Sequence, residues 1–334
     1  MMEADAAERV KVARLSRSLS GYLCGTHSGA LGHRRGDRLS PHEISREQAA
    51  LLPVDHSASE TLECPRWDPR GEAASLAADL RVELLRDGVM DLIIFGSQAH
   101  GTATGFSDLD AVLLFSDDVV ERPRQLPELR SAVLAAQRRI LVHQPMQHHG
   151  FEVVTPRLLN WAVDATGLPI EAVADSRALR GGSLVARFDS GRAGELARSR
   201  LSHMARELAE LDLWPRHPWR LHRVVSMFEL LPTLYLQALG ERVSKRESFA
   251  AAASRLGRAR WWPYEVLSEV RETWPRRPRP GLKAAAAMAV NPWLAITAWT
   301  RLPAAPPRTA GELLTADCLS GLRQVARKMA EAGA

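Results

Sequence analysis

The chain has 334 residues, of which 46% are hydrophobic and 25% are charged. A chain of this length and composition can bury one large core or two ordinary ones, and we expect two folded domains. Lys and Arg together outnumber Asp and Glu by 44 to 39, which gives a formal net charge of +5. This excess suits phosphate-bearing ligands but is too small to indicate a nucleic-acid-binding protein.

The cysteines and the apolar segments indicate the compartment. The three cysteines are Cys24, Cys64 and Cys318. They form no CxxC pair and are odd in number, which argues against a disulfide framework and a zinc site and fits a reducing compartment. The first residues are charged throughout, unlike a secretory signal. The apolar run at residues 284–300 is short for a membrane span and contains Pro292, so it predicts a buried helix and a turn. We expect a soluble, cytoplasmic protein without membrane association.

Residues 1–70 are the least regular part of the chain. Gly, His and Pro are scattered through them, and helical periodicity is limited to short pieces near residues 9–23 and 42–52. We therefore assign residues 1–70 to an N-terminal extension of unknown role.

From residue 71 the sequence alternates between helical and strand patterns. Apolar residues at helical spacing predict helices at residues 74–86 and 125–142. Gly88 follows the first of these helices, where a C-cap glycine is expected. Short apolar runs rich in β-branched residues predict strands. The predicted strands are residues 89–95, 108–115 and 150–154.

After Pro156 the longest patterns are helical, and no series of strands is evident. The predicted helices are residues 194–213, 219–239, 243–256, 263–273 and 310–332. Pro-rich connectors lie at residues 273–281 and 302–309. The expected fold class is α+β: a small mixed β-sheet domain with covering helices, followed by an all-α helical bundle.

Two aspartates stand at the start of the second predicted strand. Side chains at i and i+2 of a strand point to the same face, so Asp108 and Asp110 would present two carboxylates together while Leu109 and Ala111 face the core. Paired carboxylates suit Mg²⁺, which takes one or two of them and completes its octahedron with substrate phosphates. One or two such ions would orient a nucleoside triphosphate for in-line phosphoryl displacement.

The first predicted strand runs directly into Gly96 and Ser97. A glycine at this point lets the backbone approach a phosphate, and the Ser97 hydroxyl and nearby amides can donate hydrogen bonds to its oxygens. The sequence contains no Walker A loop, dinucleotide-binding glycine motif, HExxH or GxSxG elbow, which excludes the commonest rival chemistries.

At these residues the sequence resembles the nucleotidyltransferase superfamily typified by DNA polymerase β. The pattern of that family is a strand, Gly-Ser or Gly-Gly, about ten residues, and then Asp-x-Asp or Asp-x-Glu. Here ten residues separate Ser97 from Asp108. The segment GSQAHGTATGFSDLDAVLL is most similar to the small bacterial and aminoglycoside nucleotidyltransferase branch. The resemblance covers about residues 74–155. The resemblance implies a catalytic domain at residues 71–158 and a helical substrate-binding bundle at residues 159–334.

Members of this family hold a third carboxylate on a neighbouring strand, where it ligates the metal and accepts the proton of the attacking hydroxyl. The resemblance gives this place to Glu152, the only acid of the strand HHGFEVV, with Phe151 and Val153 facing the core. A strand glutamate exposed to solvent without a role is the alternative. His148 or His149 is an alternative base.

The resemblance also implies that the helical bundle closes over the nucleotide. Lys245 and Ser248 stand three residues apart at a predicted helix start, where they would bind the triphosphate. The structural alternative is a capping box formed by Ser244 and Glu247.

Aromatic and basic residues give weaker indications. Aromatic residues that would stack on a base or else fill the core are Trp214, Trp219, Tyr235, Trp261, Trp262 and Trp274. The basic run consists of Arg271, Arg276, Arg277, Arg279 and Lys283. It is interleaved with proline rather than with stacking aromatics, so a solvated linker is favoured over an RNA contact.

Together these features predict an enzyme that transfers a nucleoside monophosphate, expected to be AMP from ATP, to a hydroxyl and releases pyrophosphate. A small aminoglycoside-like acceptor is favoured over a protein side chain or an RNA 3′ end. Acidic residues of the bundle that would suit a cationic acceptor are Glu195, Glu207, Glu210, Asp212 and Glu229. The alternative is a nucleotide-binding regulatory or antitoxin-like module without turnover.

Overall fold

A computed structural model describes residues 2–25, 39–51, 59–144, 147, 150–161, 175–187, 190–275, 292 and 305–334. Its packing forms two units. The described residues of the first unit lie in Met1–Thr102, Asp108–Phe188 and, for Pro292 alone, Arg279–Thr297. Those of the second unit lie in Ala103–Ser107, Asp189–Pro278 and Ala298–Ala334. The fold class is α+β, as predicted. The described residues among the first 70 pack in the same unit as the sheet, so the division by packing differs from the division made on the sequence.

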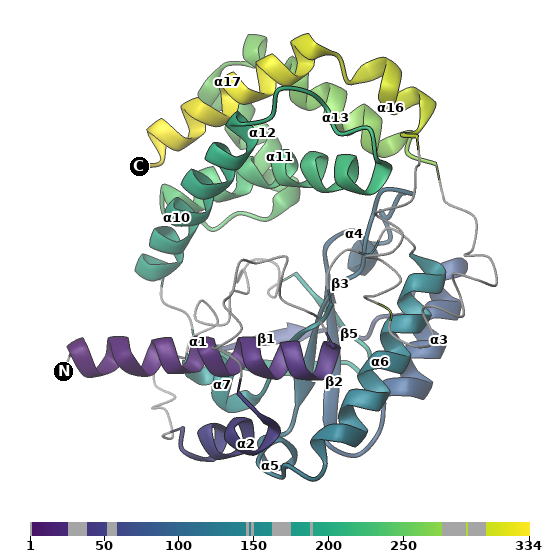
Figure 1. The fold of residues 1–334 in the computed structure, drawn as a ribbon, viewed down its shortest axis with the longest axis vertical. Helices are drawn as coiled ribbons and strands as arrows, with labels where there is room; N and C mark the ends of the chain where they lie inside the picture. Colours follow the sequence, from purple (N-terminus) through teal and green to yellow (C-terminus); the bar gives the residue numbers. More distant parts are fainter. Residues whose placement is uncertain are drawn as a thin grey trace. The chain divides into compact units, whose positions relative to one another are not determined.

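The first unit is built on a four-stranded mixed sheet (Figure 1). Its strands, in spatial order, are β4 (Glu152–Val154), β3 (Asp110–Phe115), β2 (Val89–Phe95) and β5 (Arg177–Ala178). β2 runs antiparallel to β3 and to β5, whereas β3 and β4 are parallel. The chain passes from β3 to β4 through two helices, α5 (Asp117–Val120) and α6 (Leu126–His143), which form the crossover connection that neighbouring parallel strands need.

Helices cover one face of this sheet. They are α1 (Met2–Cys24), α3 (Glu72–Leu84) and α6 (Leu126–His143), and α3 and α6 lie side by side (Figure 1). The buried residues of α6 recur at helical spacing, and they share a core with Leu92, Leu113 and Val153 of the strands. Burial of this continuous apolar face is what stabilises the unit, since helix propensity alone contributes little.

The opposite face of the sheet packs on a two-stranded antiparallel sheet. This second sheet pairs β1 (Ser59–Cys64) with β6 (Gly182–Arg187). Leu184 and Ala186 of β6 belong to the same apolar cluster as Ile93 and Val112 of the main sheet. The remaining short helices of the unit are α2 (Pro41–Ala49), α4 (Gly96–His100), α5 (Asp117–Val120) and α7 (Pro156–Trp161).

The N-terminal helix α1 protects the open edge of the sheet. β4 is an edge strand, and its Val153 N–H donates to the Ser20 hydroxyl at 2.8 Å. The Cys24 thiol bonds to the Phe151 carbonyl one turn further along α1. An uncovered edge strand is a site for aggregation, and α1 covers this edge. The poor periodicity of residues 1–70 did not reveal this structural role.

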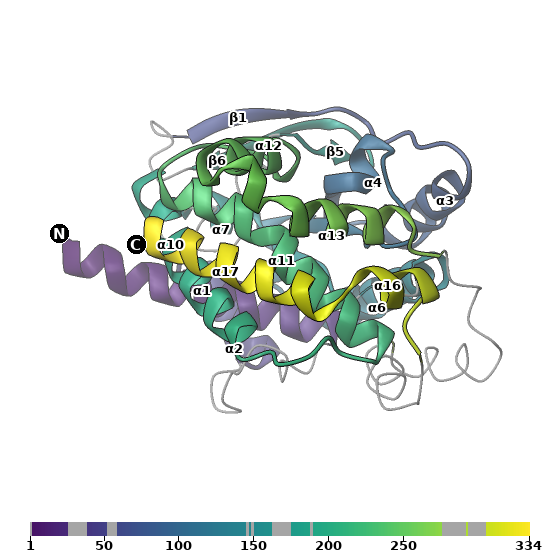
Figure 2. The ribbon, with the colours of Figure 1, turned by 90° about the horizontal axis from the view of Figure 1, so that it is seen from above.

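The second unit is helical among its described residues. Its helices are α10 (Ser190–Ala209), α11 (Pro218–Ala238), α12 (Lys245–Leu256), α13 (Trp262–Glu272), α16 (Arg308–Leu313) and α17 (Ala316–Ala332), with a 3₁₀ turn, η4 (Arg258–Arg260). α10 packs along α11, and α17 packs on both (Figure 2). The predicted capping box is confirmed: Ser244 and Glu247 bond reciprocally at the start of α12.

Several expectations about elements are wrong. The sequence analysis did not predict β1, β5 and β6. β1 is mostly polar, β5 has only two residues, and none of the three has a long alternating pattern. The expected helix over residues 310–332 is two helices, since the Thr315 hydroxyl accepts from the Cys318 N–H and starts α17 anew. Gly88 does not cap α3, which ends at Leu84; with φ at 83° it forms the turn into β2.

None of the three cysteines forms a disulfide, and all three are buried. Burial, followed by the negative charge of Glu152, raises the pKa of the Cys24 thiol to about 12. No helix in the described part of the chain has the length and apolar character of a membrane span. The predicted buried helix at residues 284–300 lies outside the described residues, apart from Pro292.

Candidate functional site

The pairing of β2 with β3 brings the two halves of the glycine–aspartate motif together. Phe95, the last residue of β2, is opposite Asp110, the first residue of β3. Gly96 follows with φ at 68°, and a Cβ placed on it would lie 3.1 Å from Asp110 Oδ2. The glycine is therefore required twice, for its left-handed backbone and for the close approach of the carboxylate.

The two aspartates flank a residue that is fixed in the core. Leu109 is 1% exposed and Ala111 is 3% exposed, so both face the helix-covered core as predicted. Asp110 lies on the opposite face of the sheet, together with Val112. The strand itself begins at Asp110, so Asp108 precedes it, and the predicted strand start at residue 108 is wrong.

Glu152 lies on the same face of the sheet as Asp110. Its partner in the parallel register is Val112, two residues along β3 from Asp110. One strand spacing and two residue steps separate the Cα atoms of Glu152 and Asp110 by about 8 Å. Glu152 is exposed, and its neighbours Phe151 and Val153 are buried, as predicted.

The donor set at the motif fits a hard divalent cation. Asp108 and Asp110 are both only partly exposed, and Asp110 is held against the Gly96 backbone. Carboxylate oxygens at such a point suit Mg²⁺, which needs few protein ligands. Within the described ranges, no three His, Cys, Asp or Glu side chains are arranged to hold a metal ion. Glu152 as a third ligand therefore stays a prediction.

Gly96 and Ser97 begin a one-turn helix, α4, which directly follows β2. Gly101, with φ at 69°, closes the turn, and the Thr102 N–H donates to the Ser97 carbonyl at 3.0 Å. The buried Trp67 indole donates to the Gln98 carbonyl at 3.1 Å. The N-terminal extension thus supplies a residue that fixes the glycine turn.

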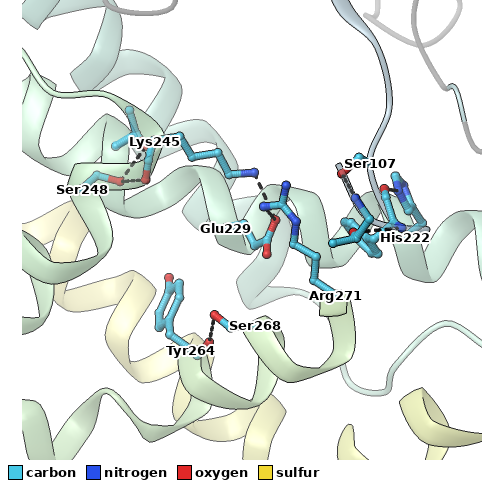
Figure 3. A network of polar contacts seen from close by, with 11 residues as sticks. Ser107, His222, Glu229, Lys245, Ser248, Tyr264, Ser268 and Arg271 are labelled. Atoms are coloured by element: carbon cyan, nitrogen blue, oxygen red, sulfur yellow. Dashed lines mark hydrogen bonds and ion pairs between the residues drawn. The ribbon is translucent and has the colours of Figure 1, made fainter. Parts of the chain in front are cut away.

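The residues just before Asp108 are anchored in the helical unit. Thr104 and Ser107 close a tight turn through two hydrogen bonds of 3.0 and 3.1 Å. The Phe106 carbonyl accepts a hydrogen bond from His222 Nε2 at 2.6 Å. The phenyl ring of Phe106 stacks on the His222 imidazole, with the ring centroids 3.9 Å apart. Trp274 packs edge-on against the same ring. Ser107 and His222 lie next to each other in Figure 3. No periodic signal in the sequence identifies this anchor.

Lys245 is held by a buried carboxylate. Its Nζ lies 3.1 Å from Glu229 Oε2, and Arg271 reaches the same oxygen at 3.5 Å (Figure 3). The Glu229 side chain is 2% exposed and that of Lys245 is 43% exposed. Burial, and then the charge of Glu229, raise the pKa of Tyr264. Glu229 is therefore already paired with two cations of the protein and does not suit a cationic acceptor.

Ser248 is fully buried in the first turn of α12. Its hydroxyl donates to the Lys245 carbonyl at 2.8 Å and bonds to the Thr233 hydroxyl at 2.9 Å. These contacts fix the helix start that carries Lys245, and they leave Ser248 inside the unit rather than at its surface.

Replacing Glu229 by glutamine is expected to lower the stability of the protein by about 1–3 kcal/mol, because a buried charged acceptor of two cations becomes a neutral amide. Thermal unfolding measures this loss. Glu207→Gln is the matched control, since its ion pair with Arg223 is exposed and is worth at most about 1 kcal/mol. Equal melting temperatures for the two variants would contradict the assignment.

Most candidate aromatic residues serve packing. Trp261 stacks on Tyr264 at 4.3 Å, the Trp214 indole donates to the Thr315 carbonyl, and Tyr235 is buried. Trp262 is the most exposed of the described candidates. The predicted residues outside the described part of the chain are His148, His149, Arg276, Arg277, Arg279 and Lys283.

The comparison with known families agrees with this geometry. Residues 79–157 match the family model described as a nucleotidyltransferase domain. This segment runs from α3 to α7 and contains both halves of the motif. No curated protein matches the chain. Residues 79–157 are thus assigned by this match to a nucleotidyltransferase domain, and nucleotidyl transfer is the class of reaction that such a domain supports.

Proposed function

We propose that the protein transfers AMP from ATP, with Mg²⁺, to a hydroxyl group of a small acceptor and releases pyrophosphate. The observation that carries this proposal is the position of the Asp110 carboxylate beside Gly96, where it leaves little room for a Cβ, on the sheet face that also carries Glu152. A glycine turn against a carboxylate provides a phosphate-binding backbone and a metal ligand side by side.

Each residue of the motif has a distinct proposed role. Asp108 and Asp110 hold one or two Mg²⁺ ions, and Glu152 completes this set. When bound, Mg²⁺ orients the triphosphate and neutralises its charge. The acceptor oxygen attacks the α-phosphorus, the bond from this phosphorus to the bridging oxygen of the β-phosphate breaks, and pyrophosphate leaves. Glu152 accepts the proton of the hydroxyl.

Gly96 and Ser97 are proposed to hold the triphosphate through backbone amides and the Ser97 hydroxyl. Lys245 is proposed as a phosphate ligand of the helical unit, because its partly exposed ammonium is held in place by Glu229. Ser248 is proposed to position Lys245, since both contacts of its hydroxyl lie inside the helical unit.

The acceptor is proposed to be a small hydroxylated molecule of the aminoglycoside kind, on the basis of the branch resemblance of the motif. A protein hydroxyl and an RNA 3′ end use the same metal chemistry and are the alternative outcomes of the test.

The test is incubation of the protein with Mg²⁺ and each of the four nucleoside triphosphates labelled at the α-phosphate. An aminoglycoside mixture, a protein mixture and RNA serve as acceptors. Label from ATP is expected in the aminoglycoside fraction with an equal amount of pyrophosphate, and a chelator should abolish both. Nucleotide binding without transfer to any of the three acceptors would instead support the regulatory, antitoxin-like alternative.

A further inference from the structure

Gln147 makes a two-point contact with the residue between the two aspartates. The Leu109 N–H donates to Gln147 Oε1 at 2.8 Å, and Gln147 Nε2 donates to the Leu109 carbonyl at 3.1 Å. Gln147 is 4% exposed. Only one orientation of the amide satisfies both contacts, because the N–H needs an acceptor and the carbonyl needs a donor.

The sheet explains why the backbone needs this contact. β3 is an inner strand, and β4 pairs with it only from Val112 onward. Leu109 therefore lies beyond the reach of the β4 ladder, although its side chain and backbone are buried with the core. Buried backbone groups require partners, and the Gln147 amide supplies one for the N–H and one for the carbonyl of Leu109.

We propose that Gln147 is a positioning residue for the metal site. It fixes the peptide groups on either side of Leu109, and so sets the separation and orientation of the Asp108 and Asp110 carboxylates. A metal ligand is tuned by the groups that orient it, and removing such a group costs about 10- to 100-fold in metal affinity or activity. The inference rests on the proposed function, because it assigns the two aspartates to a cation.

The test compares Gln147→Met, which keeps the length of the side chain and removes both bonds, with Gln144→Met as the matched control. Gln144 ends α6 three residues earlier and is partly exposed. Binding of Mn²⁺ in the presence of a non-hydrolysable ATP analogue is measured by isothermal titration, beside thermal unfolding and the Mg²⁺ dependence of turnover. Gln147→Met is expected to weaken Mn²⁺ binding about 10- to 100-fold and to raise the Mg²⁺ concentration for half-maximal turnover, while Gln144→Met behaves as the wild type.

Gln147→Asn keeps the amide but shortens the side chain, so it covers the case in which Gln147→Met does not fold. It is expected to show the same loss of Mn²⁺ affinity at a temperature where the protein stays folded. Wild-type affinity in either folded Gln147 variant overturns the inference. A wild-type protein that binds no Mn²⁺ and transfers no nucleotide overturns the proposed function instead, so the two failures are distinct.

Discussion

Replacing Asp110 with asparagine is expected to lower nucleotidyl transfer by at least about 10³-fold while leaving the fold intact. The amide has the shape of the carboxylate but no charge, so a metal ligand worth several kcal/mol is lost, and each 1.36 kcal/mol is a factor of ten in rate. Asp110 stands at the start of β3 beside Gly96 and is only partly exposed. We therefore expect that a water molecule cannot replace its carboxylate as a metal ligand. The measurement is steady-state transfer of labelled AMP at saturating Mg²⁺.

The control for this change is Asp118→Asn, which removes an aspartate of α5 in the same unit. Asp118 is exposed and paired with Arg122 one turn later, so its loss is expected to change neither transfer nor the melting temperature measurably. Asp108→Asn should match Asp110→Asn. Transfer at the wild-type rate in both Asp108→Asn and Asp110→Asn would remove the assignment of the site.

The part of the fold that the sequence predicted well is the part with strong local signals. β2 has the predicted bounds of residues 89–95, because a run of seven mostly apolar residues, three of them β-branched, lies between two glycines. Helix α6 and the capping box of α12 were predicted equally well, since helical spacing and the Ser-x-x-Glu pattern are encoded within a few residues.

The elements that the sequence did not predict depend on partners far away in the chain. β5 is two residues long and exists through its pairing with Ile93 and Ile94 of β2. β1 and β6 stabilise each other across more than a hundred residues, and neither has a strong pattern alone. Strand formation follows such cross-strand contacts more than intrinsic preference, which is why these elements were missed.

In the candidate site too, the residues with a local sequence signal were predicted and those that depend on distant contacts were not. The glycine turn and the aspartates were evident from their spacing, and strand periodicity correctly placed Leu109 in the core. The group that holds Leu109 was not evident, because Gln147 acts through contacts with a backbone N–H and a backbone carbonyl. A lone glutamine outside a regular element has no spacing that signals such a contact.

Gly96→Ala is expected to lower transfer about 10²-fold, because the new methyl group would lie 3.1 Å from Asp110 Oδ2 and force the carboxylate to move by a few tenths of an ångström. The matched control is Gly101→Ala, at the C-cap that follows the same short helix. Gly101 has φ at 69°, nearly the 68° of Gly96, but nothing lies within 4 Å of a Cβ added to it. Both variants carry the cost of a left-handed alanine, about 1–2 kcal/mol, which thermal unfolding measures. Only Gly96→Ala displaces the carboxylate, so the ratio of the two transfer rates isolates the contact between the glycine turn and Asp110. Equal rates in the two variants would show that Gly96 is needed only for its backbone conformation.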